Sequence, residues 1–108
     1  MNLRKEAEGR ECQVRIPGVC NNDRNTVILA HVNEKSVVGA GMGMKVDDAF
    51  GAICCHACHD AIDGRMNPVL DNMGYAFTHD ELLIFQYQGT FRTQKMFMDE
   101  GKLWNSQE

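Results

Sequence analysis

The chain lacks the long apolar runs that a membrane span requires, and its N-terminus carries no charged-then-apolar leader. A transmembrane helix needs about 20 consecutive apolar residues, and the apolar runs of this sequence are far shorter. We therefore expect a cytoplasmic protein that does not bind membranes. Because thiols stay reduced in that compartment, five cysteines in 108 residues indicate metal binding rather than disulfide bonds.

The sequence also lacks an excess of positive charge. Its formal net charge is −4, which disfavours nucleic-acid binding by bulk electrostatics, because that mode depends on many Lys and Arg side chains. The charges are unevenly distributed, however, with a basic first quarter and an acidic last third. A basic N-terminal face is compatible with a local nucleic-acid contact and equally with ordinary solvated charge.

No repeat or low-complexity segment is present, and the glycine-rich stretch matches no nucleotide-binding motif. Gly39, Gly41 and Gly43 alternate with other residues, a spacing that fits neither G-x-G-x-x-G nor a P-loop. We expect a loop there, in which Lys45 is a candidate for a phosphate contact. A chain of this length is expected to form one domain, 1–108, whose small core would benefit from a metal staple.

Four of the five cysteines are spaced as two pairs of zinc ligands: Cys12, Cys20, Cys55 and Cys58. The second pair is a C-x2-C knuckle, and the first pair brackets a segment with a predicted turn at Pro17-Gly18. Because the turn would bring the ends of that segment together, the four thiolates can bind one structural Zn²⁺. The fifth cysteine, Cys54, is expected to be a small buried apolar residue at a strand end.

Local patterns predict a ββα unit around these cysteines. We expect a short helix over 2–8, capped by Asn2, and strands over 26–32 and 49–54. A further helix is expected to begin at the C-x2-C knuckle. A hairpin, a knuckle and a helix in this order predict an α+β fold, with a zinc-stapled treble-clef unit over 1–66.

Residues 67–108 are expected to add a helical extension. Thr78 and Glu81 match a capping box ahead of an apolar run, so we expect a long helix over 78–100. Gly89 lies in its middle, where a kink or break is possible. The face expected to pack on the zinc unit carries apolar side chains at roughly helical spacing: Ile84, Tyr87, Phe91 and Met98, with Leu83 beside them.

A second metal site is expected on the helix after the knuckle. His59 and Asp63 lie four residues apart, so an imidazole and a carboxylate project from one face of that helix. This arrangement suits a divalent ion that takes part in chemistry, and a simple helix-face salt bridge has the same pattern.

Three segments together resemble the small phage and prophage family of HNH-type nucleases carried by lambdoid phages. They are Cys12–Cys20, Leu29-Ala30-His31 and Cys58–Arg65. More broadly, they are similar to the ββα-metal endonucleases. The resemblance covers residues 1 to about 66 and implies a nuclease encoded by a phage or prophage that processes or recombines DNA.

The resemblance also implies roles for individual residues. His31, on the first strand, takes the position of the general base. His59 and Asp63 take the positions that hold a catalytic Mg²⁺ or Mn²⁺, and Arg65 is placed to brace the scissile phosphate. A structural histidine at a strand end remains the alternative for His31.

The sequence departs from the wider superfamily at Ala30, where the residue before the base is commonly a metal ligand. Asn33, Glu34, Asp60 or water are the candidates to compensate. Three classes of function therefore stay open. They are a metal-dependent endonuclease, a non-catalytic zinc-dependent nucleic-acid-binding module, and a protein-interaction module that uses the helix over 78–100.

Overall fold

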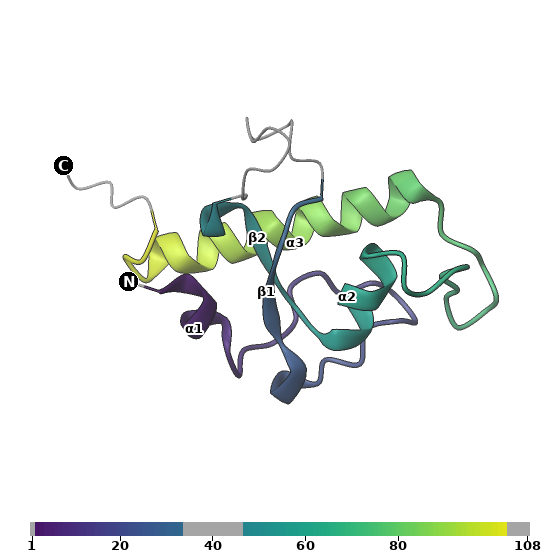
Figure 1. Ribbon diagram of the computed structural model, residues 1–108, viewed down its shortest axis with the longest axis horizontal. Helices are drawn as coiled ribbons and strands as arrows, with labels where there is room; N and C mark the ends of the chain where they lie inside the picture. Colours follow the sequence, from purple (N-terminus) through teal and green to yellow (C-terminus); the bar gives the residue numbers. More distant parts are fainter. Residues whose placement is uncertain (1, 34–46, 104–108) are drawn as a thin grey trace.

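The computed structural model describes residues 2–33 and 47–103, which form a two-stranded antiparallel sheet with helices around it (Figure 1). In chain order the elements are α1 (Leu3–Ala7), the 3₁₀ turn η1 (Arg24–Thr26), β1 (Ile28–His31), the 3₁₀ turn η3 (Asp48–Phe50), β2 (Gly51–Cys54), α2 (His56–Ile62) and α3 (His79–Asp99). The predicted α+β fold with a long C-terminal helix is confirmed. None of the helices in these two ranges has the length and apolar character to cross a membrane.

Helix α1 lies within the predicted range, and Asn2 caps it as expected. The side chain of Asn2 accepts hydrogen bonds from the backbone N–H groups of Arg4 and Lys5, so it satisfies donors that the first helical turn leaves free. The helix ends at Ala7, and Gly9 follows with φ +77°, a conformation that glycine adopts without strain.

The hairpin pairs Ile28 with Cys54 at one end and His31 with Gly51 at the other. Both strands are shorter than expected, because the residues before each of them form the 3₁₀ turns η1 and η3. All four residues of β2 are buried, which makes this strand the centre of the core.

The segment between Cys12 and Cys20 contains the predicted turn. The N–H of Val19 donates to the carbonyl of Ile16 at 3.1 Å, across Pro17 and Gly18. Gly18 has φ +74°, the value that the third position of a type II turn requires.

Helix α3 starts with the predicted capping box. The N–H of Glu81 donates to Thr78 Oγ1 at 3.1 Å, and the N–H of Thr78 donates to Glu81 Oε1 at 2.8 Å. The helix continues through Gly89 without a break. Glycine is required there by close packing, because a Cβ atom would lie 2.9 Å from the Cα of Val14.

The predicted inward face of α3 is wrong for three of its five residues, while Leu83 and Tyr87 are half-buried. Ile84, Phe91 and Met98 are exposed. Apart from Gly89, the buried residues of α3 are largely polar: Gln86, Thr90, Thr93, Gln94 and Phe97.

The physical reason is the hydrogen-bonding demand of the outer edge of β2. No further strand among the described residues pairs with that edge, and buried backbone groups must find partners. The hydroxyl of Thr93 accepts from the N–H of Ile53 at 2.9 Å. In the same way, Gln94 Nε2 donates to the carbonyl of Ala49 at 2.7 Å. These polar contacts, rather than the spacing of apolar residues, determine which face of α3 packs against the hairpin.

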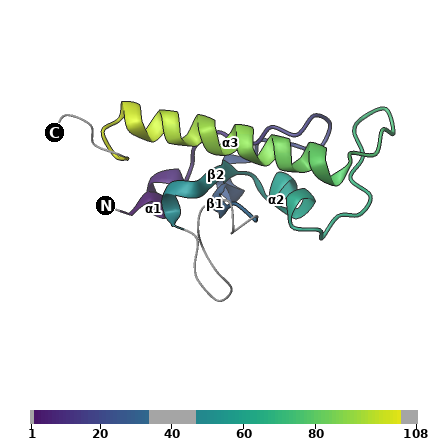
Figure 2. The same ribbon diagram turned by 90° about the horizontal axis from the view of Figure 1, so that it is seen from above.

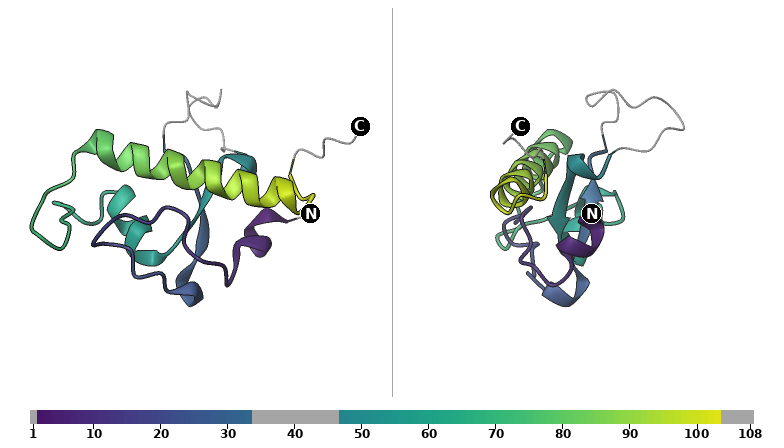
Figure 3. Two further views of the ribbon diagram at one scale, coloured as in Figure 1. Left: turned by 180° about the vertical axis from the view of Figure 1, so that it is seen from behind. Right: turned by 90° about the vertical axis from the view of Figure 1, so that its left-hand side faces the viewer.

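Seen from above, α3 forms its own layer along one side of the hairpin and α2 (Figure 2). Its C-terminal end lies beside α1, as both views in Figure 3 show. Ion pairs join these two ends. The guanidinium of Arg10 contacts Glu100 at 2.6 Å, and Lys102 Nζ contacts Glu6 at 2.6 Å. Leu103 is buried, while Trp104 lies outside the described residues.

Candidate functional site

Four of the cysteines form one cluster: Cys12, Cys20, Cys55 and Cys58. Their sulfur atoms all lie within 4.8 Å of one another, and the sulfurs of Cys20 and Cys55 are 3.8 Å apart. With Zn–S bonds of about 2.3 Å, the sulfurs of a tetrahedral zinc site lie about 3.8 Å apart. The four side chains can therefore hold a metal ion, and the donor set is consistent with structural zinc.

Local structure brings these sulfurs together from three parts of the chain. Cys55 follows β2 as the N-cap of α2, and its sulfur accepts from the N–H of Cys58 at 3.5 Å. The N–H of Cys12 donates to the side chain of Asn22 at 2.9 Å, which closes the segment that contains Cys20. The N–H of Gln13, next to Cys12, donates to the carbonyl of Ile53 at 2.7 Å and so fixes this segment to the edge of β2.

The thiols strongly affect one another's ionisation. Hydrogen bonds from Cys54 and Cys58 hold the pKa of Cys12 well below its usual range. Burial, together with the charge on Cys12, raises the pKa of Cys20 to about 11. So compact a group can ionise fully only with a cation among the sulfurs, and metal binding would release protons.

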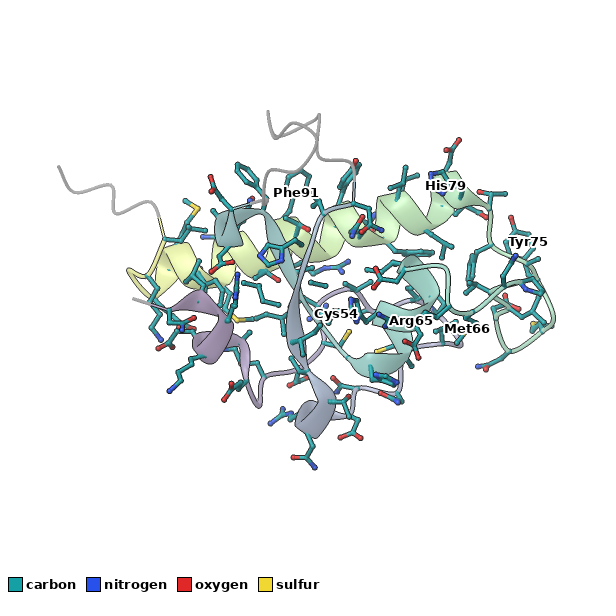
Figure 4. The ribbon with its side chains drawn as sticks, viewed as in Figure 1. Cys54, Arg65, Met66, Tyr75, His79 and Phe91 are labelled. Atoms are coloured by element: carbon teal, nitrogen blue, oxygen red, sulfur yellow. The ribbon has the colours of Figure 1, made fainter. Side chains whose placement is uncertain are left out.

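Cys54 is buried, as the sequence predicted, and lies beside the cluster (Figure 4). Its hydrogen bond to Cys12 and its burial raise its pKa far above that of a free thiol. It therefore remains a thiol next to the four candidate ligands.

His31 lies at the other end of the hairpin, and its side chain is 29% exposed. Its Nε2 atom is 2.7 Å from Asp48 Oδ1. The same oxygen accepts from Arg4 Nε at 3.2 Å. The hydrogen bond with His31, followed by that from Arg4, lowers the pKa of Asp48, so this carboxylate stays charged.

The backbone around His31 is held by α3. The buried Gln86 donates from Nε2 to the carbonyl of His31 at 3.3 Å and accepts from the N–H of Asn33 at 3.5 Å. Asn33 in turn donates from Nδ2 to the carbonyl of Ile62 at 3.0 Å. One chain of hydrogen bonds thus connects α3, the end of β1 and the end of α2.

The predicted pair on α2 is formed. His59 Nε2 lies 2.9 Å from Asp63 Oδ2, and both side chains are partly exposed. Arg65, just after the helix (Figure 4), lies 3.7 Å from Asp63 and 3.2 Å from Asp60. Asp60 also contacts His56 at 3.1 Å. The two carboxylates are therefore each shared between a histidine and Arg65.

Within residues 2–33 and 47–103, no hydrogen bond or ion pair joins the His31–Asp48 pair directly to the His59–Asp63 pair. The connection between them runs through Asn33 and the end of α2.

Among the residues considered as substitutes for a ligand at position 30, Asn33 and Asp60 are engaged in the contacts described above. Ala30 itself is buried. Glu34, and the loop with Lys45, lie outside the described residues.

Sequence reasoning missed Asp48 and Gln86. Asp48 is separated from His31 by 17 positions, and Gln86 by 55. No spacing rule connects residues so far apart, and a glutamine on a predicted helix gives no sign that it will be buried. The only local signal was the acidic pair Asp47-Asp48 immediately before the second predicted strand.

The fold and the cysteine cluster define a small α+β protein with a candidate metal centre. Comparison with known proteins gives its family. A family model described as "Putative nuclease YbcO" matches residues 1–102, and the chain belongs to this family.

Named relatives agree with this assignment. The chain is 45% identical over 100 residues to "Putative nuclease YbcO" of Escherichia coli strain K12, covering 93% of this chain and 94% of the relative. The same values hold for "Putative nuclease ybcO" of Enterobacteria phage 82. A solved structure of "a putative bacteriophage protein" from Escherichia coli K-12 MG1655 matches with a TM-score of 0.69 and 39% identity, covering 91% of this chain and 98% of that one.

Proposed function

We propose that this protein is a metal-dependent HNH-type endonuclease that hydrolyses phosphodiester bonds of nucleic acid. The observation that carries the proposal is the pairing of His59 with Asp63 on the helix that follows the hairpin, with His31 held by a carboxylate at the end of the first strand. The family to which the chain belongs and the names of its relatives support a nuclease. Because one relative comes from a phage, we propose phage or prophage DNA in the host cytoplasm as the substrate.

In this proposal His31 is the general base. An imidazole suits proton abstraction from water near neutral pH. Asp48 contacts Nε2, and this contact orients the ring. We assign the abstraction to Nδ1, the other ring nitrogen, and Asp48 would stabilise the imidazolium that forms.

His59 and Asp63 would hold a divalent ion, Mg²⁺ or Mn²⁺, which supplies positive charge to the pentacoordinate phosphate when bound. The 2.9 Å between His59 Nε2 and Asp63 Oδ2 is a hydrogen-bond distance, and an imidazole nitrogen and a carboxylate oxygen are both groups that would bind such an ion. Arg65, mostly exposed, could leave its carboxylate partners to bind a phosphate through its planar fork.

The four clustered cysteines would hold a structural zinc ion in a treble-clef unit, separate from this chemistry. In such a unit the zinc maintains the fold, since closed thiolate sites contribute folding free energy directly.

A cleavage assay tests the nuclease proposal. Duplex DNA, single-stranded DNA and RNA would be incubated with the zinc-loaded protein, with Mg²⁺, with Mn²⁺ and without added divalent ion. We expect cleavage only with the added ion, a strong loss in His59→Ala, and partial recovery of that variant at high Mn²⁺, because a ligand rather than the base is removed.

His79→Ala is the matched control, because His79 is an exposed histidine at the start of α3, and we expect full activity from it. Absence of cleavage on every substrate, or full activity of His59→Ala, would contradict the endonuclease assignment.

A non-catalytic nucleic-acid-binding zinc module is the second candidate. It is favoured by the buried Ala30 and by the ion pairs that already occupy Asp60 and Asp63. A gel shift in the absence of catalytic divalent ions, from a protein that cuts none of the substrates, would support this candidate. If the protein neither cuts nor binds any of these nucleic acids, the third class of function, a protein-interaction module, would be favoured.

A further inference from the structure

The outward face of α3 carries a stripe of exposed apolar side chains that lie outside the core formed by residues 2–33 and 47–103. Ile84 is 53% exposed, Phe91 68% and Met98 44%. They follow one another at intervals of seven residues, with the exposed Gln88 and Lys95 between them. We call these five residues the α3 stripe. Phe91 projects from the edge of α3 away from α1 and α2 (Figure 4).

The α3 stripe has the geometry of a helix-packing surface. Its residues alternate at intervals of four and three positions, so they lie in line along the helix. At a rise of 1.5 Å per residue, the stripe from Ile84 to Met98 is about 21 Å long. Single exposed apolar residues need no explanation, whereas three of them aligned on one face of a long helix, with polar residues between them, are consistent with an interaction site.

We propose that the α3 stripe pairs with the same stripe of a second copy of this chain, the two helices running antiparallel about a twofold axis near Phe91. A twofold interface requires a self-complementary surface. Phe91 is seven residues from Ile84 and seven from Met98. Antiparallel pairing about Phe91 therefore sets each Ile84 against the partner's Met98 and the two phenylalanines against each other.

The charges on the stripe favour this direction of pairing. Antiparallel packing sets Lys95 near the partner's Gln88, which can accept a hydrogen bond from the ammonium group. Parallel packing would instead place the two copies of Lys95 side by side, and neither ammonium group would then meet an acceptor on the facing helix. The antiparallel arrangement also opposes the two helix dipoles.

A nucleic acid is a poorer occupant of the same surface. Lys95 is the cation of the stripe, and it is already paired with Asp99 at 2.8 Å. Phosphate contacts need several uncompensated cations, so the balance of charge favours a second protein chain.

The expected interface is small. Two helices that meet over about 21 Å bury less than the roughly 1,200 Å² that separates standard from weak interfaces. We therefore expect a dimer that forms at micromolar concentrations and dissociates on dilution.

Sedimentation or light scattering of the full-length, zinc-loaded protein over a concentration series tests the proposal. We expect the parent to shift from monomer to dimer as concentration rises, and Phe91→Glu to remain monomeric because two carboxylates would meet at the axis. Met73→Glu is the matched control, since Met73 is 93% exposed but lies outside α3. It should dimerise like the parent.

Disulfide trapping tests the direction of pairing. Under mild oxidation, Phe91→Cys should cross-link to itself. Gln88→Cys mixed with Lys95→Cys should give cross-linked heterodimers, whereas Lys95→Cys alone should not cross-link. Met73→Cys provides the background from random collision and from the native cysteines. Cross-linking of Lys95→Cys alone would overturn the antiparallel arrangement.

Three results would overturn the proposal as a whole. The first is a parent that stays monomeric up to about 1 mM, a concentration that corresponds to only about 4 kcal/mol of binding. The second is a monomeric parent whose melting temperature falls in Phe91→Glu, because the stripe would then be covered within its own chain. The third is a loss of nucleic-acid binding in Phe91→Glu with no change in oligomeric state.

Discussion

The two ends of the β1–β2 hairpin differ in how their candidate functional side chains are held. At the end where Ile28 pairs with Cys54, the chain continues into a cluster of four cysteines, of which three are buried and Cys20 is partly buried. At the end where His31 pairs with Gly51, the side chains are partly exposed and belong to ion pairs. Only about 10 Å of strand separates the two pairs, three steps of about 3.3 Å.

We interpret the cysteine end as a structural site and the histidine end as a chemical one. Thiols clustered at close range suit the binding of a metal ion that stabilises the fold. A half-exposed imidazole beside a carboxylate contributes little to packing and is accessible to water and substrate. If this interpretation is correct, mutations at the cysteine end should unfold the protein, and mutations at the histidine end should leave it folded.

The largest effect is expected for Cys58→Ser. Removal of one thiolate from a closed four-cysteine site should abolish zinc binding and, with it, most of the folding free energy of so small a domain. Metal analysis and thermal melting would show a protein without zinc and without a cooperative transition.

Cys54→Ala is the control for that change, because Cys54 is equally buried but is not one of the four candidate ligands. It should keep one zinc per chain. Stoichiometric zinc in Cys58→Ser, together with a normal melt, would end the structural-zinc interpretation.

At the other end of the hairpin, His31→Ala should reduce the cleavage rate and leave the protein folded. Loss of a general base typically costs about 10²- to 10⁴-fold in rate, whereas loss of a partly exposed histidine should change the free energy of unfolding by less than about 1 kcal/mol. Cleavage rate, zinc content and melting temperature would be measured on one preparation. A variant that cuts like the parent would remove His31 from the mechanism, and one that unfolds would make it structural.

Gly89→Ala tests how tightly the cysteine end is supported by α3. The added Cβ would lie 2.8 Å from Val14 Cγ2 and 2.9 Å from Val14 Cα. Val14 lies two residues after Cys12, so we expect a displacement of Val14 to disturb the cysteine cluster as well. Overpacking of this kind costs about 1–3 kcal/mol, which exceeds the gain in helix propensity of about 1 kcal/mol.

Denaturant unfolding would measure this loss, with Gln88→Ala as an exposed neighbour that should change stability by less than about 0.5 kcal/mol. Equal stability of Gly89→Ala and the parent would mean that Val14 and its backbone move aside at little cost.

The smallest effect on the free energy of unfolding is expected for Asp48→Asn, and it should depend on pH. The pKa of Asp48 is lowered in the folded protein by His31 and then Arg4. A carboxyl with a lowered folded pKa stabilises the protein above its unfolded pKa, near 4, and this stabilisation is lost as pH falls further.

At neutral pH the variant should therefore be less stable than the parent, by under about 1 kcal/mol because the group is partly exposed. The difference should shrink as pH falls below about 4. A difference that stays constant over the whole range would mean that the charge on Asp48 is irrelevant to stability.

The sequence by itself determined the local features of this protein. The cap by Asn2, the turn at Pro17-Gly18 and the capping box of Thr78 and Glu81 each involve residues within four positions of one another. The C-x2-C knuckle is local in the same sense. Short-range interactions of this kind depend on residue type and spacing alone, so they can be predicted before the tertiary structure is known.

Only the tertiary structure decided which side of α3 faces the core and what holds His31. The outer edge of β2 and the strand ends present backbone groups that must be hydrogen-bonded. Gln86, Thr93 and Gln94 meet that demand across 40 to 55 positions of sequence. The spacing of apolar residues in the sequence does not show where a strand edge lacks hydrogen-bond partners. The spacing therefore predicted that Phe91 would face the core, whereas Phe91 is exposed in the structure. Asp48 reaches His31 for a similar reason, because the register of the hairpin, rather than any motif, brings the start of the second strand to the end of the first.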